Sequence, residues 1–110
     1  MTINQGFQLH PGAAFDITEI WEFIAKDNPL AARRVREEIL DAIRKLVPFP
    51  HQGHQRNDLT SRPLRFHVVR NYLIAYAPDE KPLLVIAVLH TRRSPRVMAA
   101  ILRGDRKSVV

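Results

Sequence analysis

The stretch that decides the fold is Leu83–His90, which reads LLVIAVLH. Seven apolar residues in a row are far too few to span a bilayer, but they suit a buried β-strand. Both alternating sets of side chains are apolar, whereas a strand with one wet face should alternate apolar with polar residues. The strand therefore predicts cover on both faces of a sheet. Alternation assigns Leu83, Val85, Ala87 and Leu89 to one face and Leu84, Ile86 and Val88 to the other.

Two more strand-like runs precede this one, Leu64–Val69 and Tyr72–Ala77. Arg70-Asn71 between them is a candidate two-residue hairpin turn, and the Pro-Asp-Glu-Lys-Pro segment at 78–82 is the next turn. Phe7–His10 is a candidate edge strand, and residues 51–63 are predicted to form a loop because they are rich in Gly, Asn, Asp, Ser and Pro. A small, mainly antiparallel sheet is expected.

Two amphipathic helices are predicted ahead of the three main strands. The first begins at Pro11, and the second begins with Asn28 as N-cap and Pro29 at its first position. Asp16, Glu19 and Glu22 fall off the apolar stripe of the first helix and are expected to face water. That stripe is Ile17, Ile20, Trp21 and Ile24, so Trp21 is predicted to be core. The second stripe is Ala32, Val35, Ile39, Ala42, Ile43 and Leu46, before Pro48 and Pro50 end the helix.

Helices joined by so short a turn fold back on each other as a hairpin. The predicted class is α+β: an N-terminal helical hairpin packed on one face of the sheet. For the second face, Pro95–Leu102 is a candidate cover with helical spacing of its apolar residues; a partner protein, or a central strand that is simply well buried, is the alternative. Residues 1–103 are expected to form one domain, and residues 104–110 a basic, flexible tail.

Positive charge gathers at the C-terminal end. The chain carries a net +6, and residues 92–110 hold six Lys/Arg against one Asp. Such a field attracts acidic or polyanionic partners; docking of an acidic protein, contact with nucleic acid and simple solvation all remain open. The basic residues are Arg92, Arg93, Arg96, Arg103, Arg106 and Lys107.

Several classes of function are excluded or disfavoured by composition. The chain has no cysteine, which rules out disulfides, zinc thiolates and cysteine nucleophiles. His51 and His54 have no carboxylate or thiol beside them, so no metal site is predicted, and no cofactor motif occurs. Residues 1–10 lack the pattern of a signal peptide, and a cytoplasmic location is expected.

At this point the sequence resembles the ParE/RelE superfamily of toxins from type II toxin–antitoxin systems, and it is closer to the ParE branch. The resemblance spans residues 1–103 and depends on the order and spacing of its pieces. Those pieces are the residues 9–17, LHPGAAFDI; Ile20 to Phe23; Ala31-Ala32-Arg33; Leu46 with Pro50-His51-Gln52-Gly53; Arg65; the residues 72–76, YLIAY; and the residues 88–93, VLHTRR. His10 stands where the family often has Ser.

The resemblance implies a toxin held by a partly disordered, often acidic antitoxin. ParE-type members are associated with poisoning DNA gyrase, whereas RelE-type members cut messenger RNA on the ribosome. Metal-free RNA cleavage needs a base, an acid and cations for the phosphorane charge. The candidates for those roles are Arg65, His67, His90 and Arg92.

RelE-like nucleases are expected to carry a tyrosine or a His-Tyr pair after the last strand, and here no tyrosine follows Tyr76. The preferred hypothesis is therefore a ParE-like toxin that acts by binding, without cofactor or metal. Its alternatives are a RelE-like mRNA interferase and a non-toxic relative that only captures an antitoxin. Residues predicted to bind the target or the antitoxin are Arg92, Arg93, Arg96, Met98, Ile101, Leu102 and Arg103.

Overall fold

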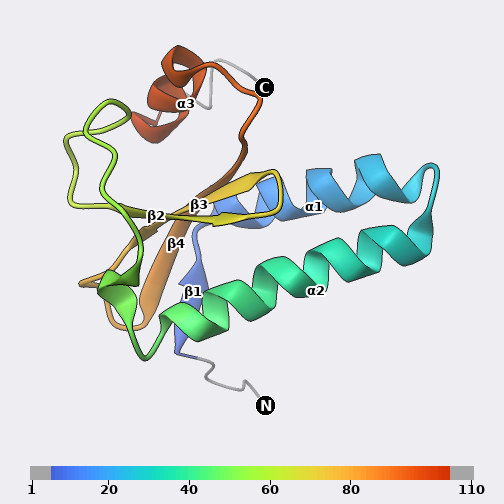
Figure 1. Cartoon of the computed structure of the whole chain (residues 1–110), viewed down its shortest axis with the longest axis horizontal. Helices are drawn as coiled ribbons and strands as arrows, with labels where there is room; N and C mark the ends of the chain where they lie inside the picture. The colour runs from blue at the N-terminus through green and yellow to red at the C-terminus, as the bar shows by residue number, and fades with distance from the viewer. Residues whose placement is uncertain (1–5, 105–110) are drawn as a thin grey trace.

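A computed structural model describes residues 6–104 and confirms the α+β class (Figure 1). Four strands form one mixed sheet in the order β1-β4-β3-β2. The strand β1 lies parallel to β4, and the β2–β3 and β3–β4 pairs are antiparallel. The elements are β1 (Phe7–Leu9), α1 (Pro11–Ala25), α2 (Pro29–Leu46), the 3-10 helix η1 (Pro50–Gln52), β2 (Arg65–Val69), β3 (Tyr72–Ala77), β4 (Leu83–His90) and α3 (Pro95–Leu102).

Side-chain caps fix where the two long helices begin. The Asn28 Oδ1 accepts the Ala31 N–H at 3.0 Å, which confirms the predicted N-cap of α2. At the start of α1, the His10 Nδ1 accepts the Gly12 N–H at 3.0 Å. Histidine thus performs the capping role at the position where the resembled family often has Ser.

The helical hairpin covers one face of the sheet and forms the first of two cores (Figure 1). Each helix contributes an apolar stripe, which packs on the strand residues beneath it. The buried members of this hairpin core are Ala13, Ile17, Val35, Ile39, Ile43, Leu46, Ile74, Tyr76, Leu83, Val85 and Val88.

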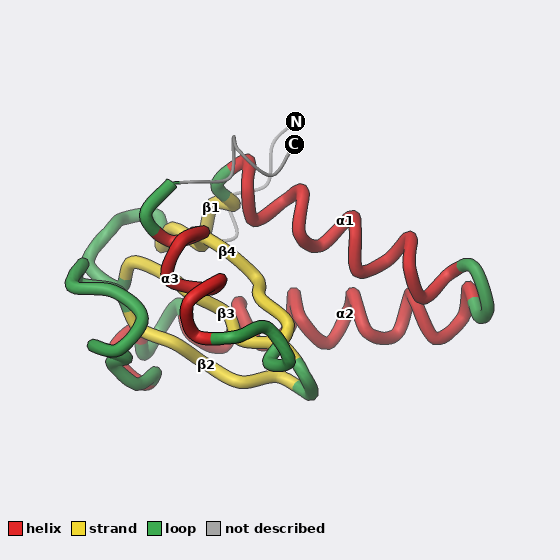
Figure 2. The backbone as a smooth tube through the Cα atoms, turned by 90° about the horizontal axis from the view of Figure 1, so that it is seen from above, coloured by secondary structure: helices red, strands yellow, loops and turns green. Residues whose placement is uncertain are grey.

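The second face of the sheet is covered by α3, which confirms the prediction that Pro95–Leu102 forms this cover (Figure 2). The 51–63 segment is not a plain loop: it begins within η1, and Leu59 is buried beside the sheet. Arg62 Nη1 donates to the Leu102 carbonyl at 3.0 Å and joins this segment to the end of α3. The buried members of this α3 core are Leu59, Leu64, Phe66, Leu73, Ala75, Ala87, Leu89, Met98, Ile101 and Leu102.

A β-bulge in β4 changes which side chains share a face. Ala75 pairs with Ala87, but the next residue, Tyr76, pairs with Val85, so Ile86 is the extra residue. Simple alternation across the whole strand was therefore wrong. Leu83, Val85 and Val88 belong to the hairpin core, whereas Ala87 and Leu89 belong to the α3 core.

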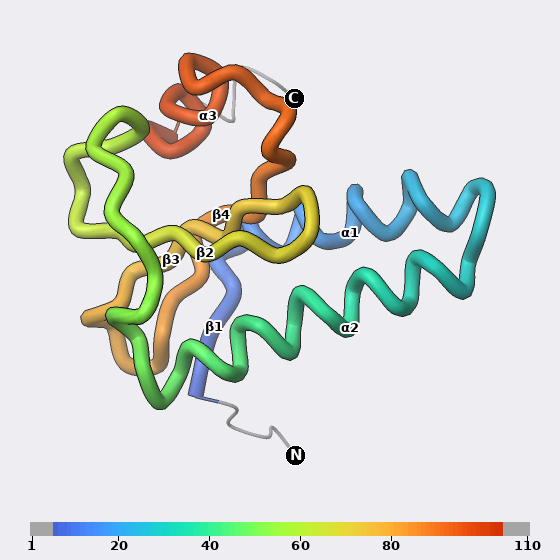
Figure 3. Tube along the Cα trace, viewed as in Figure 1, coloured from blue at the N-terminus to red at the C-terminus, as the bar shows by residue number. Residues whose placement is uncertain are grey.

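Two predictions for α1 were also wrong. Asp16 does not face water: it is 7% exposed, and its Oδ2 accepts the Val88 N–H at 2.9 Å. Trp21 is not core, because it is 40% exposed. The reason is visible in Figure 3, where the second half of α1 extends beyond the sheet and has only α2 to pack against.

The predicted tail at 104–110 lies outside the described residues except for Gly104, so its character stays a prediction. Among the helices within residues 6–104, none has the length and apolar character needed to cross a membrane.

Candidate functional site

Two of the predicted site residues, His90 and Arg92, lie close together at the end of β4. The β-bulge in β4 shifts the β3–β4 register so that Tyr72 lies opposite His90. Their rings meet edge to face, with centroids 5.3 Å apart and planes at 76°. The His90 Nδ1 also accepts the Arg92 N–H at 3.0 Å, so the strand end orients the basic loop that follows it.

Beside this pair lies a hollow of about 260 Å³ between α1 and the strand ends, which we call the β4-end groove. Phe23 stands at its border with 74% of its side chain exposed. The residues that line the groove are Asp16, Glu19, Ile20 and Phe23 of α1, with Tyr72, Val88, His90 and Arg93 opposite.

Three predicted binding residues are exposed: Arg92 and Arg93 on the segment that links β4 to α3, and Arg96 in the first turn of α3. None of them takes part in the four ion pairs formed within residues 6–104. Arg103 is also exposed, and its N–H closes the last turn of α3. The predicted basic surface therefore exists as a short stretch of arginines beside the β4-end groove.

The apolar residues predicted to bind a partner are already occupied in this chain. Met98, Ile101 and Leu102 are 5%, 8% and 2% exposed and pack into the α3 core. As long as α3 stays docked on the sheet, only their arginine neighbours are open to a partner.

Arg65 and His67 lie on β2, the strand at the edge of the sheet opposite β1. The Arg65 Nη1 donates to the Gly53 carbonyl at 2.9 Å and so holds the loop after η1. His67 borders a cleft of about 330 Å³ between β2 and α2. Burial, together with nearby His54, lowers the pKa of His67 below its ordinary value. The Arg65 side chain is thus engaged in holding local structure, and His67 lies in a different cleft from His90.

The four candidate nuclease residues do not converge on one point. His67 pairs with Ile74, and Ile74 pairs with Val88, so the buried Ile74 of β3 stands between His67 and β4, the strand that bears His90. Two strand spacings of about 4.8 Å each keep β2 and β4 about 10 Å apart. Instead, the structure gives His90 a tyrosine neighbour, Tyr72, which the sequence interpretation did not include.

The sequence held only part of the signal for that neighbour. The turn at 70–71 pairs Val69 with Tyr72, but the β4 residue opposite Tyr72 depends on the β-bulge, because an unshifted register from Ala77 and Leu84 would place Leu89 there. No comparable signal marked Phe23 or Asp16, because their positions depend on where α1 crosses the end of the sheet.

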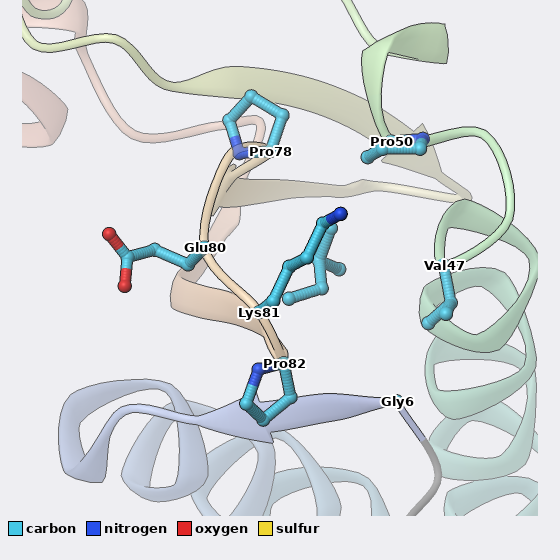
Figure 4. Close-up of a pocket in the computed structure, with 8 residues that line it drawn as sticks. Gly6, Val47, Pro50, Pro78, Glu80, Lys81 and Pro82 are labelled. Atoms are coloured by element: carbon cyan, nitrogen blue, oxygen red, sulfur yellow. The ribbon is translucent and has the colours of Figure 1, made fainter.

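A second cleft, of about 460 Å³, lies at the opposite end of the sheet and contains none of the predicted site residues (Figure 4). Pro50, Pro78 and Pro82 form much of its lining, while the Glu80 carboxylate points away from it. Within residues 6–104, no group of three His, Asp or Glu side chains is placed to hold a metal ion. The β4-end groove with its arginines is therefore the candidate site.

Comparison with known families decides what kind of protein carries this site. The family described as ParE toxin of type II toxin-antitoxin system, parDE, matches residues 7–95. This chain belongs to the ParE toxin family. A comparison with curated proteins found no match.

The ParE match runs from β1 to the first residue of α3, so it includes the helical hairpin, the whole sheet and the arginines at 92 and 93. Nearly all of α3 lies beyond the matched residues. Membership of the ParE family makes this chain the toxin of a toxin–antitoxin pair, and it implies an antitoxin as partner.

Proposed function

We propose that this ParE-family toxin arrests growth by binding DNA gyrase in the cytoplasm, and that a cognate antitoxin neutralises it by binding the toxin. The observation that carries the proposal is the family match over residues 7–95. A toxin that acts by binding needs a rigid surface and no convergent catalytic groups.

The geometry supports a binding mode. Arg65 is engaged with the Gly53 carbonyl, and His67 lies two strands away from His90. By contrast, Arg92, Arg93 and Arg96 are exposed and form no ion pair within residues 6–104, which suits the capture of an acidic surface.

The test is induction of the chain in bacteria with DNA, RNA and protein synthesis scored separately, alongside a supercoiling assay with purified gyrase. We expect DNA synthesis to fall first, gyrase to be inhibited, and co-expression of the cognate antitoxin to restore growth. Intact DNA with rapid loss of translated messages would contradict gyrase as the target. Harmless overexpression with tight antitoxin binding would instead identify a non-toxic relative.

A second candidate, ribosome-dependent cleavage of mRNA, is favoured by one observation, the contact between Tyr72 and His90. A tyrosine hydroxyl and an imidazole beside arginines are groups that can move protons and stabilise charge in RNA cleavage. Purified chain added to translating ribosomes should then cut mRNA, and Tyr72→Phe and His90→Ala should each abolish cutting. The absence of cuts by the unaltered chain would remove this candidate.

A further inference from the structure

We propose that two copies of this chain associate through the cleft at the start of β4, with the exposed Phe49 ring of each copy seated in the cleft of the other. This surface lies at the opposite end of the sheet from the β4-end groove, and its occupant is independent of the proposed function. We call it the proline cleft, and its lining residues are Gly6, Val47, Pro50, Pro78, Glu80, Lys81, Pro82 and Leu83.

The walls of the proline cleft are fixed by contacts between distant parts of the chain. The Pro50 carbonyl accepts the Tyr76 hydroxyl at 2.7 Å, and the Gly6 carbonyl accepts the Leu83 N–H at 3.0 Å. Gly6 has a φ of +81°, and a Cβ built on it would lie 2.7 Å from Val47 Cγ1, so the chain before β1 is in direct contact with the end of α2. The cleft of about 460 Å³ is therefore preformed.

Phe49 is an exposed aromatic ring beside this cleft. It stands between Val47 and Pro50, which line the cleft, but it is not part of the lining itself, and it is 69% exposed. Its backbone is held on both sides, because its N–H donates to the Leu46 carbonyl at 3.2 Å and its carbonyl accepts the Gln52 N–H at 3.0 Å. The chain thus displays an apolar ring next to an apolar hollow that the ring does not fill.

The chemistry of the proline cleft suits an aromatic ring. Proline and aromatic rings form complementary surfaces, as in the binding of proline-rich segments by aromatic-lined grooves. Pro50, Pro78 and Pro82 supply the proline surface here, and Lys81 extends between them while the Glu80 carboxylate points away (Figure 4). An ammonium group attracts the face of an aromatic ring, and Lys81 forms no ion pair within residues 6–104. An aromatic side chain should therefore bind here better than an aliphatic one.

Position and charge favour a second copy of the chain as the source of that ring. Ring and cleft lie side by side on one surface, so a two-fold axis between two copies would form the contact twice. The chain carries a net +6, and the arginines of residues 92–96 would repel a second copy. The turn at 78–82, by contrast, carries two acidic residues and one lysine, so repulsion is weakest at this end.

Association through the proline cleft would leave the β4-end groove of each copy open. The strand β4 has eight residues, and at ~3.3 Å per residue its two ends are about 23 Å apart. A dimer joined near the start of β4 therefore presents two sets of arginines. A target with two acidic sites would bind such a dimer more tightly than it binds one chain.

The experiment is sedimentation equilibrium of the purified chain over a wide range of concentrations. Two exchanged rings make a small interface, so we expect a dissociation constant on the order of 10–100 μM. Phe49→Ala should weaken association at least about tenfold, whereas Phe49→Trp, which keeps an aromatic ring, should preserve it. Lys81→Gln should weaken it about threefold, because the cation is lost.

The matched controls are Phe23→Ala, which removes another highly exposed aromatic ring, and Lys45→Gln, which removes an exposed ammonium group outside the proline cleft. Both should change the dissociation constant less than about twofold. Circular dichroism and thermal unfolding establish that each variant is folded. Hydrogen exchange gives a reading that needs no variant, because amides of the 78–82 turn should gain protection as the concentration rises.

The outcomes decide between occupants of the proline cleft. A chain that stays monomeric up to about 500 μM overturns the dimer, since even weak specific interfaces associate below that concentration. Association that is unchanged in Phe49→Ala, or that is lost in Phe23→Ala, places the contact elsewhere and overturns the proline cleft. Association that added salt weakens would indicate charged surfaces, because salt should instead relieve the repulsion between two basic chains. If Phe49→Ala loses binding to the antitoxin or to gyrase while self-association is unchanged, the second copy is the wrong occupant.

Discussion

One face of the sheet is covered by two helices of 15 and 18 residues that follow each other in the chain, whereas the other is covered by a helix of eight residues. The two helices that cover the hairpin core follow each other in the chain and have capped starts, and they pack on residues of β3 and β4. The α3 core is instead covered by one short helix together with Leu59 and Leu64, which come from the irregular segment between η1 and β2.

The bond from Arg62 Nη1 to the Leu102 carbonyl joins the two parts of this cover, the irregular segment and the end of α3. Few contacts and a short helix are the conditions under which a segment opens before the rest of a protein unfolds. The two faces of the sheet are both buried, but they should therefore differ in how easily they open.

The largest expected effect is on the hairpin core. Ile39 is fully buried in the middle of α2, and Ile39→Ala leaves a cavity between the helices and the sheet. We expect a loss of about 4 kcal/mol in the free energy of unfolding, measured by urea denaturation. Leu30→Ala, at an exposed position of the same helix, is the control and should cost less than about 0.5 kcal/mol. A small effect of Ile39→Ala would show that the hairpin is not the dominant core.

The α3 core should respond differently to a similar truncation. Leu102→Ala is expected to cost about 2–3 kcal/mol, less than the Ile39 change, because the end of a short helix can relax toward the cavity. Hydrogen exchange should show amides of α3 losing protection well before those of α2. Equal loss of protection in both helices would break the distinction between the two faces.

Asp16 links the hairpin to the unpaired edge of β4, and its removal tests that link. Asp16→Ala leaves the Val88 N–H buried without its acceptor, and we expect a loss of about 2 kcal/mol. Asp16→Asn keeps a side-chain oxygen at the same place and should recover most of the stability. Thermal unfolding of the three proteins measures the difference, and equal destabilisation by both variants would mean that the negative charge matters more than the hydrogen bond.

A smaller effect is expected from the hydrogen bond that joins Arg62, in the 51–63 segment, to the end of α3. Arg62→Ala removes one hydrogen bond to the Leu102 carbonyl and should cost about 1 kcal/mol. The loss should be confined to α3 when hydrogen exchange is followed residue by residue. If the amides of α2 lose protection to the same extent, this hydrogen bond stabilises the whole domain and not only the face covered by α3.

The smallest effect concerns pH on the hairpin face. Burial lowers the pKa of His67 from the ordinary 6.5, so the unfolded chain takes up a proton that the folded chain resists. The stability contributed by neutral His67 is complete above about pH 6.5 and is lost as pH falls through that value toward the lowered pKa. His67→Gln should therefore reduce the change in the thermal unfolding midpoint between pH 7.5 and 5. His51→Gln, at an exposed position, is the control and should leave that pH dependence as it is in the unaltered chain.

The sequence by itself determined the order of elements and most of their bounds. Periodicity and caps were sufficient because a helix start such as Asn28-Pro29 and a turn such as Arg70-Asn71 depend on neighbouring residues. The apolar character of Leu83–His90 also predicted correctly that both faces of the sheet would be covered. These features follow from local chemistry and from counting which surfaces must be buried.

Only the tertiary structure decided which side chains meet. The extra residue Ile86 reversed the alternation within β4, and the position at which α1 leaves the sheet exposed Trp21 while it buried Asp16. The contact of Tyr72 with His90 and the separation of His67 from both depend on strand order and register. Such features are set by contacts between residues far apart in sequence, where one bulge or one short strand such as β1 changes every neighbour.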